Sequence, residues 1–309
     1  MRLQRTIDKK IGFSKYIEAL LRIFRNWIYI NIIFPIIGRK QKRKKHYASL
    51  CVIFKNEGKF FKEFLEYYLL LGIDHFYFYD NNSEDDYKKV IKPYIEKGLI
   101  TLIDWPDKPG QMTAYNHCIK EFSNETNWIG FIDVDEFIVP LKWEKIPDWL
   151  EEYQKLPSVW LFWKLFSSSG HVKEDLKTPV IEQFYVASDL IRSSKVFLNT
   201  DWSHKVNNFR TPHAIRFKGF GPVVQKHAGL LFGLINYIND DSKLEIQINH
   251  YATKSYEYFT KVKCTRGDVI KNRENCYNIP KFFQTEDHCY RADYHIFKYL
   301  IKLKLRLDK

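Results

Sequence analysis

Four short apolar runs alternate with amphipathic stretches between residues 48 and 132, and this alternation constrains the fold more than any other feature. The apolar runs have the length and composition of buried strands, at residues 48–54, 73–79, 99–105 and 128–132. The stretches between them space their apolar side chains as helices do, at residues 59–71, 87–97 and 111–122. This order predicts an α/β fold with a mostly parallel sheet, flanking helices and right-handed crossovers.

Polar side chains follow every one of these four runs. They are Asn56 and Glu57, then Asp80 to Asn82, then Asp104, and finally Asp133 and Asp135. In open α/β sheets, ligands bind outside the carboxyl ends of the strands. The sequence therefore predicts a single site at that edge of the sheet.

The loop after the first run limits what such a site binds. It reads Lys55-Asn56-Glu57-Gly58, which is neither a G-x-G-x-x-G fingerprint nor a Walker A loop. The chain also lacks a G-x-S-x-G elbow and an H-E-x-x-H helix. Dinucleotide-dependent oxidoreductases, P-loop NTPases, α/β-hydrolases and zinc peptidases of those types are therefore disfavoured.

The fourth run ends in Asp133-Val134-Asp135-Glu136. Side chains alternate along a strand, so Asp133 and Asp135 point to the same side. Clustered carboxylates repel one another unless a cation neutralises them, and oxygen ligands of this kind suit Mg²⁺ or Mn²⁺, which also bind phosphates. A bare Asp-x-Asp also occurs as an acidic turn, but the polar residues at the other strand ends favour a metal site that holds a diphosphate.

Beyond residue 140 the pattern is less regular. An apolar run at 158–166 leads into Ser167 to His171, and a last strand is expected at 246–251, followed by a basic helix that carries Lys261, Lys263 and Arg266. Residues 180–225 suggest short strands and loops that form an acceptor-side or phosphate-side surface. Its basic residues are Lys195, His204, Lys205, Arg210, His213 and Arg216.

The net charge of +12 belongs to the two ends of the chain. Residues 1–46 carry a net +11 and residues 291–309 a net +4, whereas residues 47–290 carry a net −3. This distribution argues against nucleic-acid binding by the body and for ends that contact an anionic surface.

The N-terminal segment has the features of a helix that lies on a membrane. Apolar residues recur at helical spacing between 11 and 30, and a basic run follows at 39–45. The apolar run at 27–37 is too short to cross a bilayer. The segment also lacks a small-residue cleavage site, so we do not expect it to be a secretory signal peptide. Five scattered cysteines suggest reduced thiols. We expect a cytoplasmic protein, peripheral on the inner face of the membrane; the alternative is an ordinary helix packed on the body.

Several short motifs, taken in order, resemble those of the GT-A glycosyltransferases, and more narrowly glycosyltransferase family 92 and its family-2-like bacterial relatives. They are Asn56-Glu57, Asp80-Asn81-x-Ser83, Gln111-x-x-Ala114-Tyr115-Asn116-x-Cys118, Phe131-Ile-Asp133-Val-Asp135-Glu136, Ser168-Ser169-Gly170-His171 and Asn249-His250-Tyr251-x-x-Lys254, with Arg266-Gly267 downstream. The resemblance divides the chain into a basic amphipathic segment (1–46), a GT-A domain (47–270) and a basic helical extension (271–309).

The resemblance implies an inverting, metal-dependent transfer of a hexose such as galactose from a UDP-sugar to a saccharide or lipid-linked glycan. It implies three ligands for Mn²⁺ or Mg²⁺, namely Asp133, Asp135 and His250. It also implies contacts to the nucleotide sugar from Asn56, Glu57, Asp80, Gln111, Asn116, Asp133, Lys254 and Arg266.

An inverting displacement also needs a carboxylate that takes the acceptor proton. Glu182 is the preferred candidate, with Asp189 as an alternative; Glu136 and His171 are expected to orient the acceptor or the metal ligands.

Two other classes stay open. A sugar nucleotidyltransferase would need a basic glycine-rich loop after the first strand, and Asn56-Glu57-Gly58 is not one. A non-enzymatic module that binds membranes or polyanions would leave the carboxylates at the strand ends unexplained.

Overall fold

The computed structural model describes residues 17, 21, 24–25, 27–38, 40–218, 244–266 and 277–308. Within them, the predicted alternation of strands and helices is confirmed. Its elements are β1 (His46–Phe54), α3 (Phe61–Leu70), β2 (His75–Asp80), α4 (Tyr87–Glu96), β3 (Ile100–Asp104), α5 (Gln111–Phe122) and β4 (Thr126–Phe131).

The second half of the main sheet comes from more irregular sequence. Its strands are β5 (Glu136–Pro140), β6 (Ser158–Phe166), β7 (Val186–Asn199), β10 (Ile246–His250) and the short β11 (Arg291–Ala292). A separate hairpin pairs β8 (Val206–Thr211) with β9 (Ala214–Phe217). The shorter helices are α2 (Phe34–Ile37), α6 (Ile146–Glu151), α7 (Val180–Gln183), α8 (Tyr256–Tyr258), α9 (Cys264–Arg266), α10 (Ile279–His288) and α11 (Leu300–Leu307).

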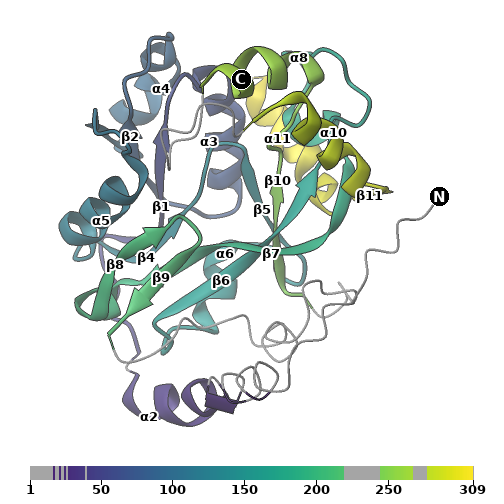
Figure 1. Ribbon diagram of the computed structural model, residues 1–309. Helices are drawn as coiled ribbons and strands as arrows, with labels where there is room; N and C mark the ends of the chain where they lie inside the picture. Colours follow the sequence, from purple (N-terminus) through teal and green to yellow (C-terminus); the bar gives the residue numbers. More distant parts are fainter. Residues whose placement is uncertain are drawn as a thin grey trace.

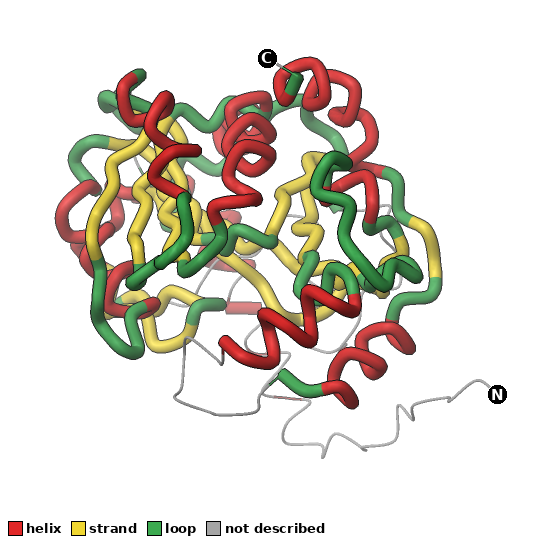
Figure 2. The backbone as a smooth tube through the Cα atoms, turned by 90° about the horizontal axis from the view of Figure 1, so that it is seen from above, coloured by secondary structure: helices red, strands yellow, loops and turns green. Residues whose placement is uncertain are grey.

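The strand order is β3-β2-β1-β4-β7-β6-β10-β5, with β11 paired to β7. Strands β3, β2, β1 and β4 are parallel neighbours, β7 is antiparallel to both β4 and β6, β10 is parallel to β6, and β5 is antiparallel to β10. All strands on this path except β7 and β5 therefore run in one direction. The predicted α/β fold with a mostly parallel sheet and flanking helices is confirmed (Figures 1 and 2).

The sheet has to curl, because the chain passes directly from β4 to β5. Four strand spacings of about 4.8 Å would separate these two strands by about 19 Å in a flat sheet, slightly beyond the reach of the short connection. Instead, a tight turn joins them, in which Glu136 N donates to Asp133 O at 3.1 Å. The curl therefore brings β5 and β10 back towards the carboxyl end of β4.

Helices cover both faces of the sheet, and the alternation along β1 assigns its side chains to two cores. Leu50 and Val52 pack with the aromatic side chains of α3 and α4, whereas Cys51 and Ile53 pack with α5 and the β8–β9 hairpin. The face on α3 and α4 is rich in Phe and Tyr, and buried hydroxyls there find backbone partners: Tyr68 OH donates to Glu136 O at 2.8 Å. The α3 side thus supports the backbone of the acidic turn.

The C-terminal helix packs on the body. Arg306 of α11 forms an ion pair of 3.2 Å with Glu66 of α3, and Leu303 is fully buried. Ile301 and Leu305 stay exposed. Residues 300–307, which belong to the predicted basic helical extension (271–309), thus pack on α3.

Residues 41–44 are also held by the body. Gln41 Nε2 donates to Asn199 Oδ1 at 2.7 Å, and Lys44 Nζ donates to Thr200 Oγ1 at 2.6 Å. Before them, Trp27, Ile32, Ile36 and Ile37 expose their side chains, whereas Phe34 is buried. Among the described residues, no helix combines the length and apolarity needed to span a membrane.

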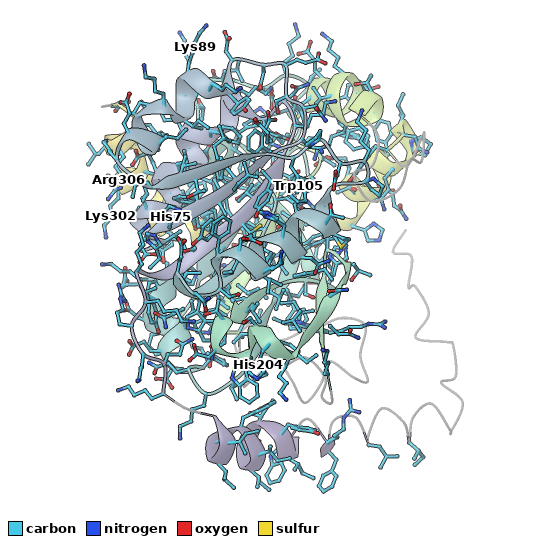
Figure 3. The ribbon with its side chains drawn as sticks, turned by 90° about the vertical axis from the view of Figure 1, so that its left-hand side faces the viewer. His75, Lys89, Trp105, His204, Lys302 and Arg306 are labelled. Carbon is cyan, nitrogen blue, oxygen red and sulfur yellow. The ribbon has the colours of Figure 1, made fainter. Side chains whose placement is uncertain are left out.

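Helices α2 and α11 lie towards opposite ends of the molecule. In Figure 1, α2 lies at the bottom and α10 and α11 lie near the top. Figure 3 agrees, since Lys302 and Arg306 of α11 lie well above His204, which is near α2. Among the described residues, α2 and α11 therefore do not contribute to one continuous surface.

Candidate active site

The acidic turn between β4 and β5 lies at the centre of a cluster of charged side chains. Asp135 and Glu136 are buried, with 6% and 0% of their surface exposed, whereas a third of the Asp133 side chain is open to solvent. Burial of carboxylates is costly unless cations and hydrogen bonds compensate them. The structure supplies a different cation to each of the two aspartates.

Asp133 is held by β7 and α5. Lys195 Nζ, fully buried, lies 2.7 Å from Asp133 Oδ2, and Gln111 Nε2 donates to Asp133 Oδ1 at 2.9 Å. The Tyr115 hydroxyl lies 3.4 Å from the same Oδ1. The register explains this, because Phe131 on β4 pairs with Val196 and thereby places Lys195 beside the start of the turn. Both oxygens of Asp133 are thus engaged.

Glu136 completes this part of the cluster. Its Oε2 accepts from Asp133 N at 2.9 Å and lies 3.5 Å from Lys195 Nζ. Burial raises the pKa of Glu136 well above its ordinary value, because the opposing attraction of Lys195 does not compensate for the lost hydration. A carboxyl with no exposed surface cannot reach an acceptor hydroxyl, so the structure assigns Glu136 to support of the turn.

Asp135 is held by residues from the other side of the curled sheet. Lys263 Nζ lies 2.6 Å from Asp135 Oδ2, and His250 Nε2 lies 3.5 Å from Asp135 Oδ1. His250 pairs with Glu136 in the β10–β5 ladder, and its ring packs against Trp163. Burial alone would raise the pKa of Asp135, but Lys263 and His250 hold it well below its usual value. The surrounding cations therefore favour the charged form of Asp135.

Lys254 is a buried cation without a hydrogen-bond partner among the described residues. Its Nζ lies 4.3 Å from the ring centre of Phe60 and 4.5 Å from that of Tyr258, which are cation–π distances. Burial lowers the pKa of Lys254 to about 8, although Asp135 and Glu57 act in the opposite direction. Its φ of 49° is also uncommon for a residue other than glycine. Unusual backbone and an unpaired buried charge together indicate a functional position.

The structure brings together two of the three predicted metal ligands. Two ligands that each lie about 2.1 Å from one ion at a right angle are about 3.0 Å apart, so the 3.5 Å between Asp135 and His250 is close to a shared-ligand distance. Asp133 is occupied by Lys195 and Gln111. In the part of the chain that the structure describes, no three His, Cys, Asp or Glu side chains converge to hold a metal ion. Asp135 and His250 therefore fit an ion whose remaining ligands are phosphate oxygens and waters, as is usual for Mg²⁺.

The residues predicted to contact the nucleotide after β1 and β2 mostly form hydrogen bonds within the loops that follow these strands. Asp80 accepts from Ser83 N and from the Tyr87 hydroxyl, both at 2.8 Å, so each of its oxygens has a partner. Asn56 adopts a positive φ and accepts from Glu84 N at 2.7 Å. Glu57 is buried, with the Tyr258 hydroxyl 3.5 Å away. Glu57 therefore lies beside the aromatic rings that surround Lys254.

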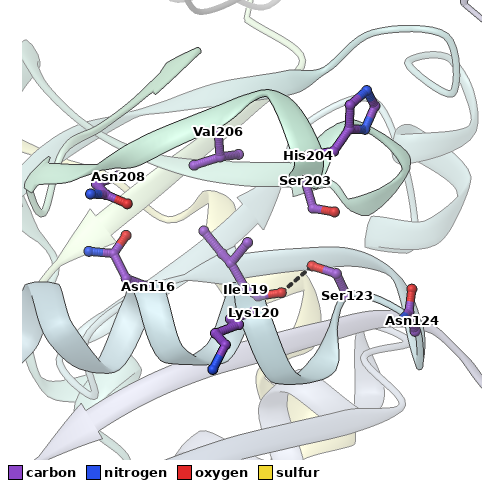
Figure 4. Close-up of a pocket in the computed structure, with 9 residues that line it drawn as sticks. All are labelled: Asn116, Ile119, Lys120, Ser123, Asn124, Ser203, His204, Val206 and Asn208. Carbon is purple, nitrogen blue, oxygen red and sulfur yellow. Dashed lines mark hydrogen bonds between the residues drawn. The ribbon is translucent and has the colours of Figure 1, made fainter. Parts of the chain in front are cut away.

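Asn116 does not lie with Gln111, although both are on α5. Its Oδ1 accepts from Phe209 N at 2.9 Å, and its side chain lines a cavity of about 310 Å³ between α5 and β8. Figure 4 shows Asn116 facing Asn208 across this cavity. Ser123 and Asn124, which precede β4, also line it, so the cavity is at the amino end of that strand. The prediction that Asn116 contacts the nucleotide sugar finds no support in this geometry.

Of three further predicted residues, Glu182 and His171 have their contacts away from the two aspartates, and the side chain of Arg266 is not described by the structure. Glu182 on α7 forms an ion pair of 2.6 Å with Lys304 of α11, and no hydrogen bond or ion pair among the described residues joins it to the acidic turn. His171 packs edge-on against Phe184, and its backbone oxygen accepts from Tyr256 N. The Arg266 side chain lies outside the described part of the structure.

Sequence reasoning did not single out the two lysines that bind the aspartates. Lys195 and Lys263 appeared only as members of broader basic stretches. A lysine within an apolar run, as in Ser194-Lys195-Val196-Phe197-Leu198, is the signal that could have found Lys195, because such a residue needs a buried anion.

Comparison with known proteins identifies the class. The profile of glycosyltransferase family 92 matches residues 44–299, which is most of the chain. The chain belongs to glycosyltransferase family 92, and the resemblance inferred from its motifs is confirmed. The match extends past residue 270 and ends at residue 299, directly before α11.

Individual relatives match shorter segments. A family 92 protein of Ricinus communis is 39% identical over 95 residues, which are 30% of this chain and 17% of the relative. A β-1,4-galactosyltransferase of Caenorhabditis elegans is 36% identical over 107 residues, 30% of this chain and 25% of the relative. A galactan β-1,4-galactosyltransferase of Arabidopsis thaliana is 34% identical over 92 residues, 26% and 18% of the two chains. The matched segments thus span at most a quarter of these relatives.

Solved structures show a weaker likeness. Staphylococcus aureus TarS (residues 1–349) matches with a TM-score of 0.35 and 16% identity over 50% of this chain and 48% of TarS. The same TarS segment in complex with UDP matches with a TM-score of 0.34 and 14% identity over 68% and 59% of the two chains.

Proposed function

We propose that the chain is an inverting, metal-dependent hexosyltransferase that moves a hexose, such as galactose, from a UDP-sugar to a saccharide or lipid-linked glycan. The observation that carries the proposal is the pairing of Asp135 with His250 near Lys254, whose ammonium has no hydrogen-bond partner in the described part of the chain. Membership of family 92 and the names of the galactosyltransferase relatives support the reaction class and the sugar.

The leaving group of such a reaction is a nucleoside diphosphate, so catalysis depends on charge placed where the departing oxygens gain negative charge. Asp135 and His250 would hold Mn²⁺ or Mg²⁺, which supplies Lewis-acid stabilisation to the diphosphate when bound. Lys254 offers a second positive charge, because its ammonium donates no hydrogen bond to any described group of the protein. Gln111 and Lys195 fix Asp133, whose partly exposed carboxylate faces the same site.

The inverting outcome rests on the family resemblance. Glu182 was the preferred proton acceptor, but its ion pair with Lys304 does not support that role. The anomeric configuration of the product, determined by nuclear magnetic resonance, tests inversion without an assignment of the base.

We also propose attachment to the inner face of a membrane through the N-terminal segment. The exposed side chains of Trp27, Ile36 and Ile37 lie next to the basic run at 39–45, and this combination suits an anionic lipid surface. The C-terminal helix α11 is not part of this surface, because it lies at the other end of the molecule (Figures 1 and 3).

The experiment that tests the reaction class is a product assay on the purified chain. UDP-hexoses are incubated with Mn²⁺ and with galactose-terminated oligosaccharides, and UDP and pyrophosphate are quantified separately. The proposal expects release of UDP that depends on the acceptor. A sugar nucleotidyltransferase would instead release pyrophosphate from UTP and a sugar phosphate, and a binding module would release neither.

A further inference from the structure

Lys263 occupies the carboxylate that the proposed metal would need. Its ammonium lies 2.6 Å from Asp135 Oδ2, and both side chains are more than nine-tenths buried. The other oxygen, Oδ1, faces His250 Nε2 at 3.5 Å. One carboxylate therefore has a lysine on one side and the second proposed ligand on the other.

Binding of both the Lys263 ammonium and a divalent ion to Asp135 is electrostatically unfavourable when no donor is bound. Asp135 and Lys263 together carry no net charge, so a divalent ion would leave a net charge of +2 in a buried place, where like charges repel strongly. A diphosphate that carries about two negative charges would remove this excess. The compensation is strongest if Lys263 and the metal both contact the incoming phosphates, because the attraction grows as the charges approach.

The local backbone is suited to such a movement. Lys263 is the last residue of a π-helical turn, Phe259–Lys263, and π-helical turns are frequent at functional sites. Its ammonium is carried on a flexible four-carbon stem with three rotatable donors. Lys254, whose Nζ has no hydrogen-bond partner among the described residues, marks where an anion would be received.

We propose that Lys263 compensates the charge of Asp135 from its Oδ2 side in the donor-free protein and so competes with a divalent cation, and that it transfers its ammonium to the donor diphosphate when metal and nucleotide bind together. This inference rests on the proposed function, because it presupposes a metal at Asp135 and His250. Its consequence is that metal and UDP-sugar bind cooperatively: each removes the charge imbalance that the other creates.

The test measures Mn²⁺ affinity of the full chain, by electron paramagnetic resonance of free Mn²⁺, with and without saturating UDP. Lys263→Met removes the competing ammonium. Lys263→Arg keeps the charge and binds a carboxylate through two parallel hydrogen bonds. Lys261→Met is the matched control, because Lys261 lies on the same turn and is exposed, with Glu257 as its partner and no contact to Asp135.

Without UDP, we expect Lys263→Met to bind Mn²⁺ about tenfold or more tighter than the wild type, as loss of one charge-assisted contact predicts. Lys263→Arg should bind more weakly than the wild type, and Lys261→Met should match it. UDP should raise Mn²⁺ affinity by a larger factor in the wild type than in Lys263→Met.

Lys263→Met leaves a buried carboxylate unpaired and risks unfolding. In that case Lys263→Arg decides alone, since equal Mn²⁺ affinity of Lys263→Arg and the wild type overturns the inference. Equal affinity of Lys263→Met and the wild type without UDP also overturns it, but leaves the metal site intact. Absence of Mn²⁺ binding by every variant, even with UDP, overturns the metal site as well.

Discussion

His250 Nε2 lies 3.5 Å from Asp135 Oδ1, although the two residues come from strands far apart in the sequence. The contact follows from the antiparallel pairing of β10 with β5, which sets His250 opposite Glu136. His250 is the last residue of β10, and Asp135 lies in the turn directly before β5, where its backbone oxygen accepts from Tyr251 N at 2.8 Å. Backbone hydrogen bonds therefore fix both residues, which favours the precise positioning that a catalytic metal requires.

Asp135→Asn should abolish transfer and also lower stability. The variant removes a metal ligand and leaves the buried ammonium of Lys263 without its carboxylate. Breaking a buried ion pair from one side costs about 3–5 kcal/mol. Thermal unfolding and turnover measured on the same preparation check this, and normal turnover would rule out Asp135 as a metal ligand.

Lys254→Met should weaken UDP binding and, at neutral pH, stabilise the fold. A charge-assisted contact to the diphosphate contributes about 1.5–3 kcal/mol, so the dissociation constant should rise about tenfold to a hundredfold. The stability gain is expected because the unpaired buried ammonium is replaced by an apolar side chain. Calorimetric titration with UDP and thermal unfolding measure the two effects, and unchanged UDP affinity would contradict the role of Lys254.

The same lysine predicts a pH dependence. Burial lowers the pKa of Lys254 to about 8, below its value in an unfolded chain, so between these values the unfolded chain binds more protons. Stability should therefore rise with pH through this window in the wild type relative to Lys254→Met. UDP affinity should fall as pH rises through about 8, and this fall should be absent in Lys254→Met. Identical pH profiles of the two proteins would show that Lys254 does not titrate there.

Glu182→Gln should keep most of its activity. If Glu182 were the catalytic base, the turnover number should fall by about 10²–10⁴. The structure pairs Glu182 with Lys304 at a partly exposed position, where an ion pair contributes about 0–1 kcal/mol. Steady-state kinetics separate these outcomes, and a collapse of the turnover number at unchanged Michaelis constant would restore Glu182 as the base.

Deletion of residues 1–39 should reduce attachment to anionic vesicles while soluble acceptors are still used. The deletion stops before Gln41 and Lys44, which hold the chain to the body, and it removes the apolar side chains around Trp27 and Ile36. Attachment of the full chain should weaken with salt, because each basic residue near the surface contributes about 1 kcal/mol that is screened within a Debye length. Co-sedimentation of both proteins at low and high salt measures this, and equal pelleting would show that the segment is not the anchor.

The sequence predicted the first half of the sheet because each strand there is an apolar run that ends in polar residues. The resemblance implied that Gln111 and Asp133 both contact the nucleotide sugar, and the structure joins the two side chains by a hydrogen bond. The positions of Lys195 and Lys263 could not be predicted, because they depend on the register of β7 and on how the sheet curls. Glu182 could not be placed without the C-terminal helix that supplies Lys304.

The central claim is tested most directly by UDP release from a panel of UDP-hexoses, with galactose-terminated oligosaccharides as acceptors, in the wild type and in His250→Ala with and without Mn²⁺. The account predicts acceptor-dependent UDP release in the wild type that requires Mn²⁺ and is lost in a folded His250→Ala. Release that is independent of Mn²⁺ and unaffected by His250→Ala would contradict a metal site at Asp135 and His250. Absence of UDP release with every donor would contradict the proposed reaction itself.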